Sequence, residues 1–399
     1  MRYSPIALLL MAHFISPVLA GDPAASATAV GGVKFFEAAA ARSKGNLCLS
    51  PFSIQSALAM TYGGAEGKTR SEMAAALDFP ADASALAASF ESLNASLLKS
   101  AERGGKDTAL NVANRLFGAE GFAFRSAFLA LCKDRFGAPL GKMDFRADPA
   151  AAAQHINQWV EKQTVDRIRN LIPENALTRD TTLVLANALY LKTPWAEEFS
   201  KAPDLVFHVD GGSGGNVPAI TRTDSFGYRK AGGFTLVSVP FRGGEFQFLI
   251  LLPDGPGPLP PLTADILSAG IKLPSADVAL TLPKFRLEPP TLPLGGILQS
   301  LGMKSAFDIP QGSANFDGIA PRRPDDYLYI SDVFHKVFFA LDEKGIEAAA
   351  ATAVVMMRAT AMPVHREPVE VCVDRPFYFA VQHVPTGACL FLGRITDPR

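Results

Sequence analysis

The sequence predicts a single α+β domain, and two observations support that prediction. Residues 30–175 have the apolar spacing of helices, as in Val33, Phe36 and Ala40, whereas runs rich in β-forming residues begin at residue 182. Helices that precede strands, without a regular alternation of the two, favour an α+β arrangement over a doubly wound sheet. The length of 399 residues allows one large domain, and no internal repeat divides it.

The composition excludes several classes of protein. Hydrophobic residues make up 48% of the chain and charged residues 19%, a balance that excludes intrinsic disorder. The 33 Gly and 30 Pro residues exclude a long coiled coil. The 38 Lys and Arg residues nearly balance the 39 Asp and Glu residues, so the chain has no large net positive charge to attract nucleic acid or an anionic membrane. We expect neither as a partner.

The first 20 residues have the pattern of a secretory signal peptide. Arg2 precedes an apolar stretch around residues 6–15, and small residues stand at Val18 and Ala20. The stretch is too short to span a bilayer. We therefore expect cleavage after Ala20 and a protein that is secreted or periplasmic.

The remaining chain is expected to form a small-residue linker over residues 21–30 and one domain over residues 31–399. A domain of this size needs no disulfide staples, so its widely spaced cysteines are expected to be buried free thiols. These cysteines are Cys48, Cys132, Cys372 and Cys389. No CxxC or HExxH motif occurs, and we expect neither a metal nor another cofactor.

Local patterns predict individual elements. Residues 50–53, Ser-Pro-Phe-Ser, are typical of a helix start with Ser53 as the candidate N-cap. Residues 182–191 are apolar on both faces, which predicts a covered central strand. Turns at residues 242–245 and 385–387 lie between β-rich runs, and each predicts a hairpin.

Two motifs suggest enzymes but lack the context that such sites need. Residues 63–69 resemble a phosphate-binding loop, yet the motif is one residue short and follows a helical pattern instead of a strand. Residues 211–215 fit GxSxG, yet β-like segments lie on both sides, where a hydrolase needs a strand and then a helix. We expect a flexible loop at residues 211–215 and no enzymatic activity.

The segment over residues 343–363 has two interpretations. Its alanine content is compatible with a surface helix. Taken with a period of two, Ile346 and the alternate residues up to Met356 form an uncharged face, while Glu347 falls on the opposite face. That pattern is typical of an exposed loop or of a strand in a sheet.

Several short blocks are spread along the chain in a fixed order. The early and central blocks contain Asn46, Ser50-Pro51, Ser53, Gly64-Ala65, Thr69, Asn187-Ala188, Lys192 and Trp195. The later blocks contain Leu282-Pro283-Lys284-Phe285, Leu301-Gly302-Met303, Ala306-Phe307, His335-Lys336, Glu343-Lys344-Gly345, Arg375-Pro376-Phe377 and Phe391-Leu392-Gly393-Arg394. From about residue 31 to the end, the chain resembles the serpin family. The resemblance implies about nine helices, three β-sheets and an exposed reactive-centre loop at about residues 343–370.

The resemblance also implies suicide inhibition of a serine protease by a monomer. The protease cleaves the loop and stays attached as an acyl-enzyme, while the loop inserts into the central sheet of a metastable fold. The hinge that inserts first comprises Glu343, Lys344, Gly345, Ile346, Glu347, Ala348, Ala349, Ala350, Ala351 and Thr352. Inhibitory members usually carry Thr or Ser where this chain has Ile346, so we expect slower or tighter insertion, not its loss.

The resemblance further implies a polar latch beneath the central sheet and a tryptophan at its top. The latch residues are Ser50, Ser53, Asn187 and His335, and the tryptophan is Trp195. The same residues are compatible with ordinary buried polar groups, a helix cap and a core tryptophan.

The cleaved bond depends on the loop register. Counting from Glu343 places it between Ala359 and Thr360, which suits elastase-like or subtilisin-like proteases. A register one residue shorter places it between Arg358 and Ala359 and suits trypsin-like proteases. The alternative function is that of a non-inhibitory serpin that binds or stores a ligand, although the small hinge residues favour an inhibitor.

Overall fold

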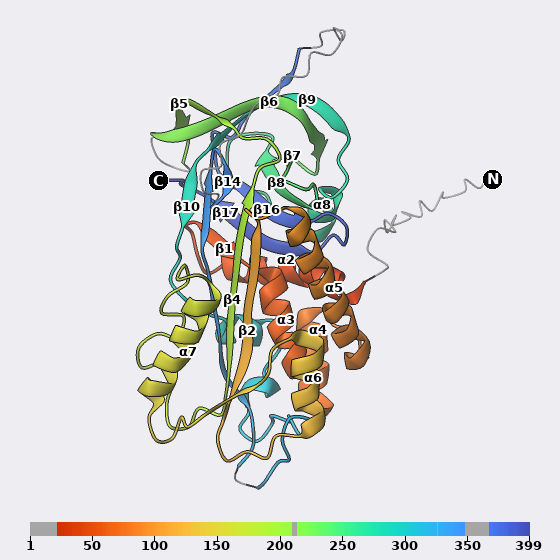
Figure 1. The fold of residues 1–399 in the computed structure, drawn as a ribbon, viewed down its shortest axis with the longest axis vertical. Coiled ribbons are helices and arrows are strands. Elements are labelled where there is room, and N and C mark those ends of the chain that lie inside the picture. Colours follow the sequence, from red (N-terminus) through yellow and green to blue (C-terminus); the bar gives the residue numbers. More distant parts are fainter. Residues whose placement is uncertain (1–21, 210–213, 325, 348–366) are drawn as a thin grey trace, which may run out of the picture.

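A computed structural model describes residues 22–209, 214–324, 326–347 and 367–399 (Figure 1). Its α-helices are α1 (Pro23–Ser26), α2 (Gly32–Ala40), α3 (Pro51–Tyr62), α4 (Gly67–Leu77), α5 (Ala83–Arg103), α6 (Ser126–Phe136), α7 (Pro149–Gln163), α8 (Ala264–Ala269) and α9 (Gly295–Ser300). A π-helical turn covers Ala27–Gly31, and a 3-10 turn covers Ser305–Phe307. The strands are β1 (Leu47–Leu49), β2 (Ala109–Ala119), β3 (Gly141–Met143), β4 (Leu183–Pro194), β5 (Ser200–Phe207), β6 (Gly215–Ala231), β7 (Phe234–Pro240), β8 (Phe246–Pro253), β9 (Ser275–Pro283), β10 (Phe285–Leu287), β11 (Leu292–Pro293), β12 (Ile330–Val337), β13 (Phe339–Asp342), β14 (Gly345–Ile346), β15 (Val369–Cys372), β16 (Phe377–His383) and β17 (Cys389–Ile395).

The strands pair into two hydrogen-bonded networks. The larger network has the order β1-β17-β16-β8-β7-β6-β9-β15, with β5 beside β6. The smaller network has the order β10-β13-β14-β4-β12-β11, with β2 beside β4 and β3 beside β2. The α+β class is confirmed. The strands are connected more extensively than three separate sheets would be. Strand β6 pairs with β9 from Ala219 to Gly227 and with β7 from Gly227 to Ala231, and β14 joins β13 to β4.

Strand β4 is the covered central strand that the sequence predicts. Every residue from Leu183 to Pro194 is buried except Lys192, which is half-buried. One face of the strand packs on α7 through a cluster that includes Ile156 and Val184. Figure 1 shows α7 on one side of β2 and β4, with α3, α5 and α6 on the other. The smaller network is thus a layer between helices.

Both predicted hairpins are present, but the first part of the chain is less helical than predicted. Strands β7 and β8 pair antiparallel, as do β16 and β17. Strands β1, β2 and β3 lie within residues 30–175, where helices were expected. Strand β2 pairs with β4 from Ala109 to Gly118, and this long-range pairing outweighs its weak local strand signal.

The linker prediction for residues 21–30 is wrong where the structure describes them. Asp22 caps α1 by accepting hydrogen bonds from the backbone N–H groups of Ala24 and Ala25, and the helical path continues into α2. Ala24 and Thr28 are fully buried. The small side chains let this segment pack closely on α5, so they form part of the core.

The cysteine prediction holds for three of the four thiols. Cys48, Cys132 and Cys389 are buried and free, whereas Cys372 is exposed on the edge strand β15. Within the described ranges, no helix has both the length and the apolar character of a membrane span. The GxSxG serine at position 213 and the predicted signal sequence lie outside the described residues.

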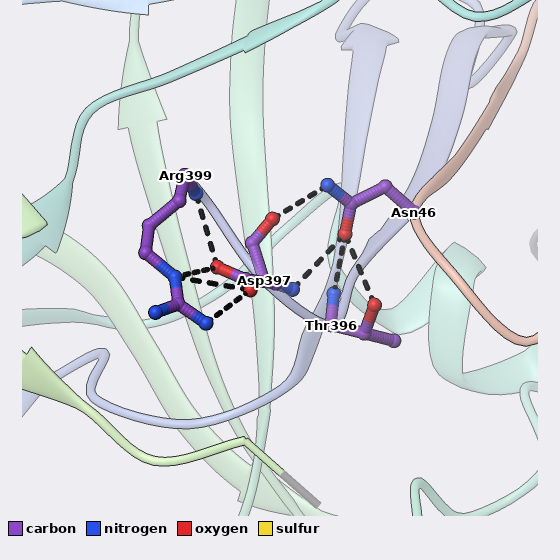
Figure 2. Close-up of polar contacts among 4 residues, drawn as sticks. All are labelled: Asn46, Thr396, Asp397 and Arg399. Atoms are coloured by element: carbon purple, nitrogen blue, oxygen red, sulfur yellow. Dashed lines mark hydrogen bonds and ion pairs between the residues drawn. The ribbon is translucent and has the colours of Figure 1, made fainter. Parts of the chain in front are cut away.

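Asn46 fastens the C-terminal tail to the segment before β1 (Figure 2). Its Oδ1 accepts hydrogen bonds from the N–H and hydroxyl groups of Thr396 at 2.8 and 3.1 Å and from the Asp397 N–H at 3.1 Å. Its Nδ2 donates to the Asp397 carbonyl oxygen at 2.6 Å. Arg399 pairs with the Asp397 carboxylate at 2.6 Å on the exposed side. Asn46 therefore satisfies the backbone of the tail at both a donor and an acceptor.

Replacing Asn46 by Ala is expected to lower the stability of the native state by about 2–3 kcal/mol, because two backbone N–H groups and a carbonyl lose their partners. Urea unfolding of the variant and the wild type measures the loss. The matched control is Arg399→Ala, which removes only an exposed ion pair and is expected to have a much smaller effect. Equal losses for the two variants would contradict the assignment of the anchor to Asn46.

Candidate functional site

Three polar side chains lie in register across three adjacent strands. Asn114 on β2 stands opposite Asn187 on β4, and Asn187 stands opposite His335 on β12. Their exposed fractions are 7%, 0% and 1%, respectively. Strands β4 and β12 run parallel, and Nδ1 of His335 lies 2.5 Å from Oδ1 of Asn187, so this contact bridges the two strands.

The start of α3 completes this group. The Ser53 hydroxyl lies within hydrogen-bond reach of Oδ1 of Asn114 at 2.7 Å and Oδ1 of Asn187 at 3.0 Å. Both amide groups donate to the Ser53 carbonyl oxygen, and the Ser50 N–H donates to Nε2 of His335 at 3.0 Å. The helix cap is Ser50 and not Ser53, because the Ser50 hydroxyl accepts the Ser53 N–H at 3.2 Å. We call Ser50, Ser53, Asn114, Asn187 and His335 the polar cluster.

The structure brings the four predicted latch residues together and adds Asn114. Asn114 lies in a segment where the sequence indicated helices, and its partners are 61 and 73 positions away. The usable signal was the period-two alternation of Leu110, Val112 and Leu116, in which Asn114 takes the place of an apolar residue and is itself buried.

The polar cluster holds His335 as a neutral imidazole. Nε2 accepts the Ser50 N–H, so the proton resides on Nδ1, which donates to Asn187. Burial lowers the pKa of His335 from its ordinary value near 6.5 to about 3. Protonation at Nε2 would place two N–H donors against each other, that of the imidazole and that of Ser50, and would break the hydrogen bond between them.

This arrangement predicts an acid-dependent loss of stability. The unfolded chain binds a proton at His335 below about pH 6.5, whereas the native chain stays neutral until about pH 3. The native state is therefore expected to lose about 1.4 kcal/mol per pH unit through this residue within that interval as the pH falls. Urea unfolding at pH 7, 6 and 5 should show a shallower pH dependence for His335→Gln than for the wild type. Parallel curves for the two proteins would be the contrary result.

Trp195 lies at the end of β4 and holds the turn over residues 342–344. It is 1% exposed, stacks on Phe241 with ring centroids 4.6 Å apart, and also contacts Phe199 and Phe248. Its Nε1 donates to the Asp342 carbonyl oxygen at 2.9 Å, and its backbone N–H donates to the carbonyl oxygen of residue 344 at 2.8 Å. The turn that starts the predicted hinge is thus attached to an aromatic group.

Two residues of the predicted hinge, Gly345 and Ile346, already belong to the sheet. Strand β14 lies between β13 and the end of β4 and is antiparallel to both, with Ile346 opposite Leu341 on one side and Thr193 on the other. Ile346 is 1% exposed. Gly345 has a φ of 143°, and a Cβ there would lie 2.7 Å from Cα of Pro194, so only glycine fits between the flanking strands.

Glu347 ends this short strand with a strained conformation. Its φ of 49° lies in the left-handed region, and its N–H donates to the Ala340 carbonyl oxygen at 3.1 Å. One carboxylate oxygen pairs with Arg167 from the loop after α7, while the other is buried without a hydrogen-bond partner among the described residues. Burial raises the pKa of Tyr190 to about 12, and the neighbouring Glu347 carboxylate adds to the shift.

Glu343, the first residue of the predicted hinge, contacts two other segments. Its carboxylate pairs with Lys284 at 3.1 Å, and its carbonyl oxygen accepts the Phe199 N–H at 2.8 Å. The later predicted hinge residues, 348–352, and the candidate cleavage sites at Arg358, Ala359 and Thr360 lie outside the described residues.

Comparison with known proteins gives a consistent result. The family model described as "Serpin (serine protease inhibitor)" matches residues 26–398. A leukocyte elastase inhibitor of Sus scrofa is 35% identical over 369 residues, which cover 89% of this chain and 93% of that protein. The crystal structure of Serpin48, a highly specific serpin of the insect Tenebrio molitor, superposes with a TM-score of 0.81 at 28% identity, covering 94% of this chain and 98% of the other. The crystal structure of a complex of human thyroxine-binding globulin superposes with a TM-score of 0.80 at 25% identity, covering 94% of this chain and 98% of the other.

Proposed function

The chain belongs to the serpin family, and we propose that it is a suicide inhibitor of serine proteases that acts by insertion of its cleaved loop. The observation that carries this proposal is β14. Gly345 and Ile346 pair antiparallel with strands on both sides, which is the orientation that a longer inserted strand would need. Further residues would extend β14 between β4 and β12, whose present pairing runs from Leu183 to Leu189.

The proposed chemistry is acyl transfer. The serine hydroxyl of the protease adds to the carbonyl carbon of the residue before the cleaved bond, and the C–N bond breaks. The new amino group leaves with the proton, and an ester joins the loop to the protease. Each inserted residue adds backbone hydrogen bonds worth about 0.5–1.5 kcal/mol net, so about fifteen residues supply on the order of ten kcal/mol. This energy moves the attached protease before water hydrolyses the ester.

The polar cluster is proposed to act as a latch. The contact between Asn187 and His335 joins β4 to β12, so insertion between these strands must break it. The Ser53 and Ser50 groups at the start of α3 remain available to each strand after separation, so the hydrogen bonds can re-form around a new strand.

The proposed target is an elastase-like or subtilisin-like protease. A small residue before the cleaved bond, Ala359, suits a small primary pocket, and the similarity to a leukocyte elastase inhibitor supports this choice. Cleavage after Arg358 would instead suit a trypsin-like protease.

We also propose that the protein is exported. The support is the pattern of the first 20 residues, with cleavage expected after Ala20. Expression of the full chain in a host with a secretory pathway should yield a mature protein whose mass corresponds to a start at Gly21. A product that retains Met1 would contradict export by this route.

The inhibitory mechanism predicts a covalent adduct. The purified protein, incubated separately with elastase and with trypsin, should give an adduct with elastase on denaturing gels. The released C-terminal fragment should begin at Thr360, whereas a start at Ala359 would indicate cleavage after Arg358. Cleavage without an adduct and without a rise in thermal stability would contradict loop insertion. That result would favour the non-inhibitory alternative, a ligand-binding protein, as the name of thyroxine-binding globulin indicates for that structural relative.

A further inference from the structure

A polar cavity of about 360 Å³ lies beside the hinge. It is formed by the loop after α7, by the residues around β10, and by the end of β12. Its charged lining residues are Asp166, Arg167, Arg169, Arg286, Glu288 and Lys336. Four cations thus face two carboxylates, although the chain as a whole carries a formal net charge of only -1.

Two of these cations converge on one aromatic ring. The guanidinium carbon of Arg286 lies 5.0 Å from the centroid of Phe338, and that of Arg167 lies 5.8 Å from it. Cation–π contact holds each group near the buried ring, and each guanidinium also has one carboxylate partner, Glu288 for Arg286 and Glu347 for Arg167. A guanidinium group has five N–H donors, so an oxyanion in the cavity could accept further hydrogen bonds from both arginines.

Lys336 adds a third, partly desolvated cation. Its ammonium donates to the Arg169 carbonyl oxygen at 2.7 Å, and it forms no ion pair with a described carboxylate. Burial lowers its pKa, with Glu288 acting weakly in the opposite direction. Glu288 itself is paired with Arg286. The cavity therefore contains positive charge that the described part of the chain does not neutralise.

From this arrangement we infer that the cavity, lined by Arg167, Arg286 and Lys336, binds a small polyvalent phosphate such as a diphosphate group. Guanidinium groups match phosphate oxygens in a bidentate manner, and the volume suits a small ligand. Binding is coupled to the hinge, because Arg167 also pairs with Glu347 at the end of β14. A phosphate that binds Arg167 weakens the ion pair between Arg167 and Glu347. By reciprocity, that ion pair weakens the binding of phosphate. The site stands independently of protease inhibition.

Calorimetric titration of the full chain with inorganic pyrophosphate tests this inference. We expect saturable binding at one site, weakened about tenfold by Arg286→Gln and by Lys336→Gln. The control Lys133→Gln removes an exposed cation on α6 and should leave the affinity unchanged. Circular dichroism and thermal unfolding of each variant verify that it folds. Absence of saturable binding, or equal weakening by all three variants, would overturn the site.

The coupling has its own test in the same experiment. Glu347→Gln releases Arg167 and is expected to tighten pyrophosphate binding about fivefold. The matched control is Glu91→Gln, which releases Arg135 on a distant helix surface and should leave the affinity unchanged. Unchanged affinity in Glu347→Gln would overturn the coupling, and an equal gain in both variants would show a general charge effect in its place. These readouts measure binding alone, so they do not depend on whether the chain inhibits a protease.

Discussion

If the protein is the inhibitor that we propose, replacing Ile346 by Arg is expected to convert it into a substrate. Ile346 is 1% exposed between Leu341 and Thr193, and a guanidinium there would be buried beside these two uncharged residues. Burial of an unpaired charge costs several kcal/mol, which favours expulsion of β14 and slows insertion. In the proposed mechanism insertion competes with hydrolysis of the acyl-enzyme, so the yield of adduct should fall at least about tenfold.

Denaturing gels of the variant with elastase measure the adduct, and thermal unfolding of the cleaved chain gives a second readout. Val369→Arg is the matched control, because it adds the same charge at an exposed position on β15. Ile346→Thr keeps a β-branched side chain and should retain the adduct. An Ile346→Arg variant that forms as much adduct as the wild type would show that insertion does not pass through this position.

Replacing Trp195 by Ala is expected to destabilise the native state by about 3–5 kcal/mol, the largest loss for any single side chain considered. The substitution leaves a cavity among Phe199, Phe241 and Phe248 and removes the donor to the Asp342 carbonyl oxygen. The turn over residues 342–344 then loses a support, so the hinge should also become more sensitive to proteolysis.

The midpoint of urea unfolding measures the loss of stability. Trp159→Ala is the matched control, because Trp159 is only half-buried on α7 and packs at the edge of Phe117. Equal losses of stability for Trp159→Ala and Trp195→Ala would contradict the prediction that the buried contacts of Trp195 contribute more than those of a half-buried tryptophan.

Local chemistry explains which elements the sequence predicts well. The hairpins at residues 242–245 and 385–387 follow from their turn residues, and β4 follows from an apolar run that only a doubly covered strand explains. Strand β2 was missed because Asn114, Arg115 and Gly118 weaken its local signal, and its pairing with β4 spans about seventy positions. The segment after Asp22 was missed because alanine-rich sequence serves equally as linker and as closely packed helix.

The candidate site also contains residues that the sequence identifies and contacts that it does not. Ser50, Ser53, Asn187 and His335 were identified by resemblance to a family, and that resemblance supplied their proximity, which spacing alone does not. The pairing of Glu347 with Arg167 joins positions 180 residues apart and has no signal in the local sequence. Electrostatic partners of this kind become visible only when the topology is known.

The positions of β16 and β17 mean that the larger network can be completed only after the end of the chain has been synthesised. Strand β17 lies between β1 and β16, and β16 lies between β17 and β8, so the last strands of the chain occupy interior positions next to the β1 edge of the larger network. While residues 377–395 are still being synthesised, β1 and β8 each lack a neighbour that completes them. A growing chain therefore emerges from the ribosome unable to close this sheet. We propose that the protein is exported, and late completion of this sheet would suit export, because a chain must be unfolded to pass through a translocation pore.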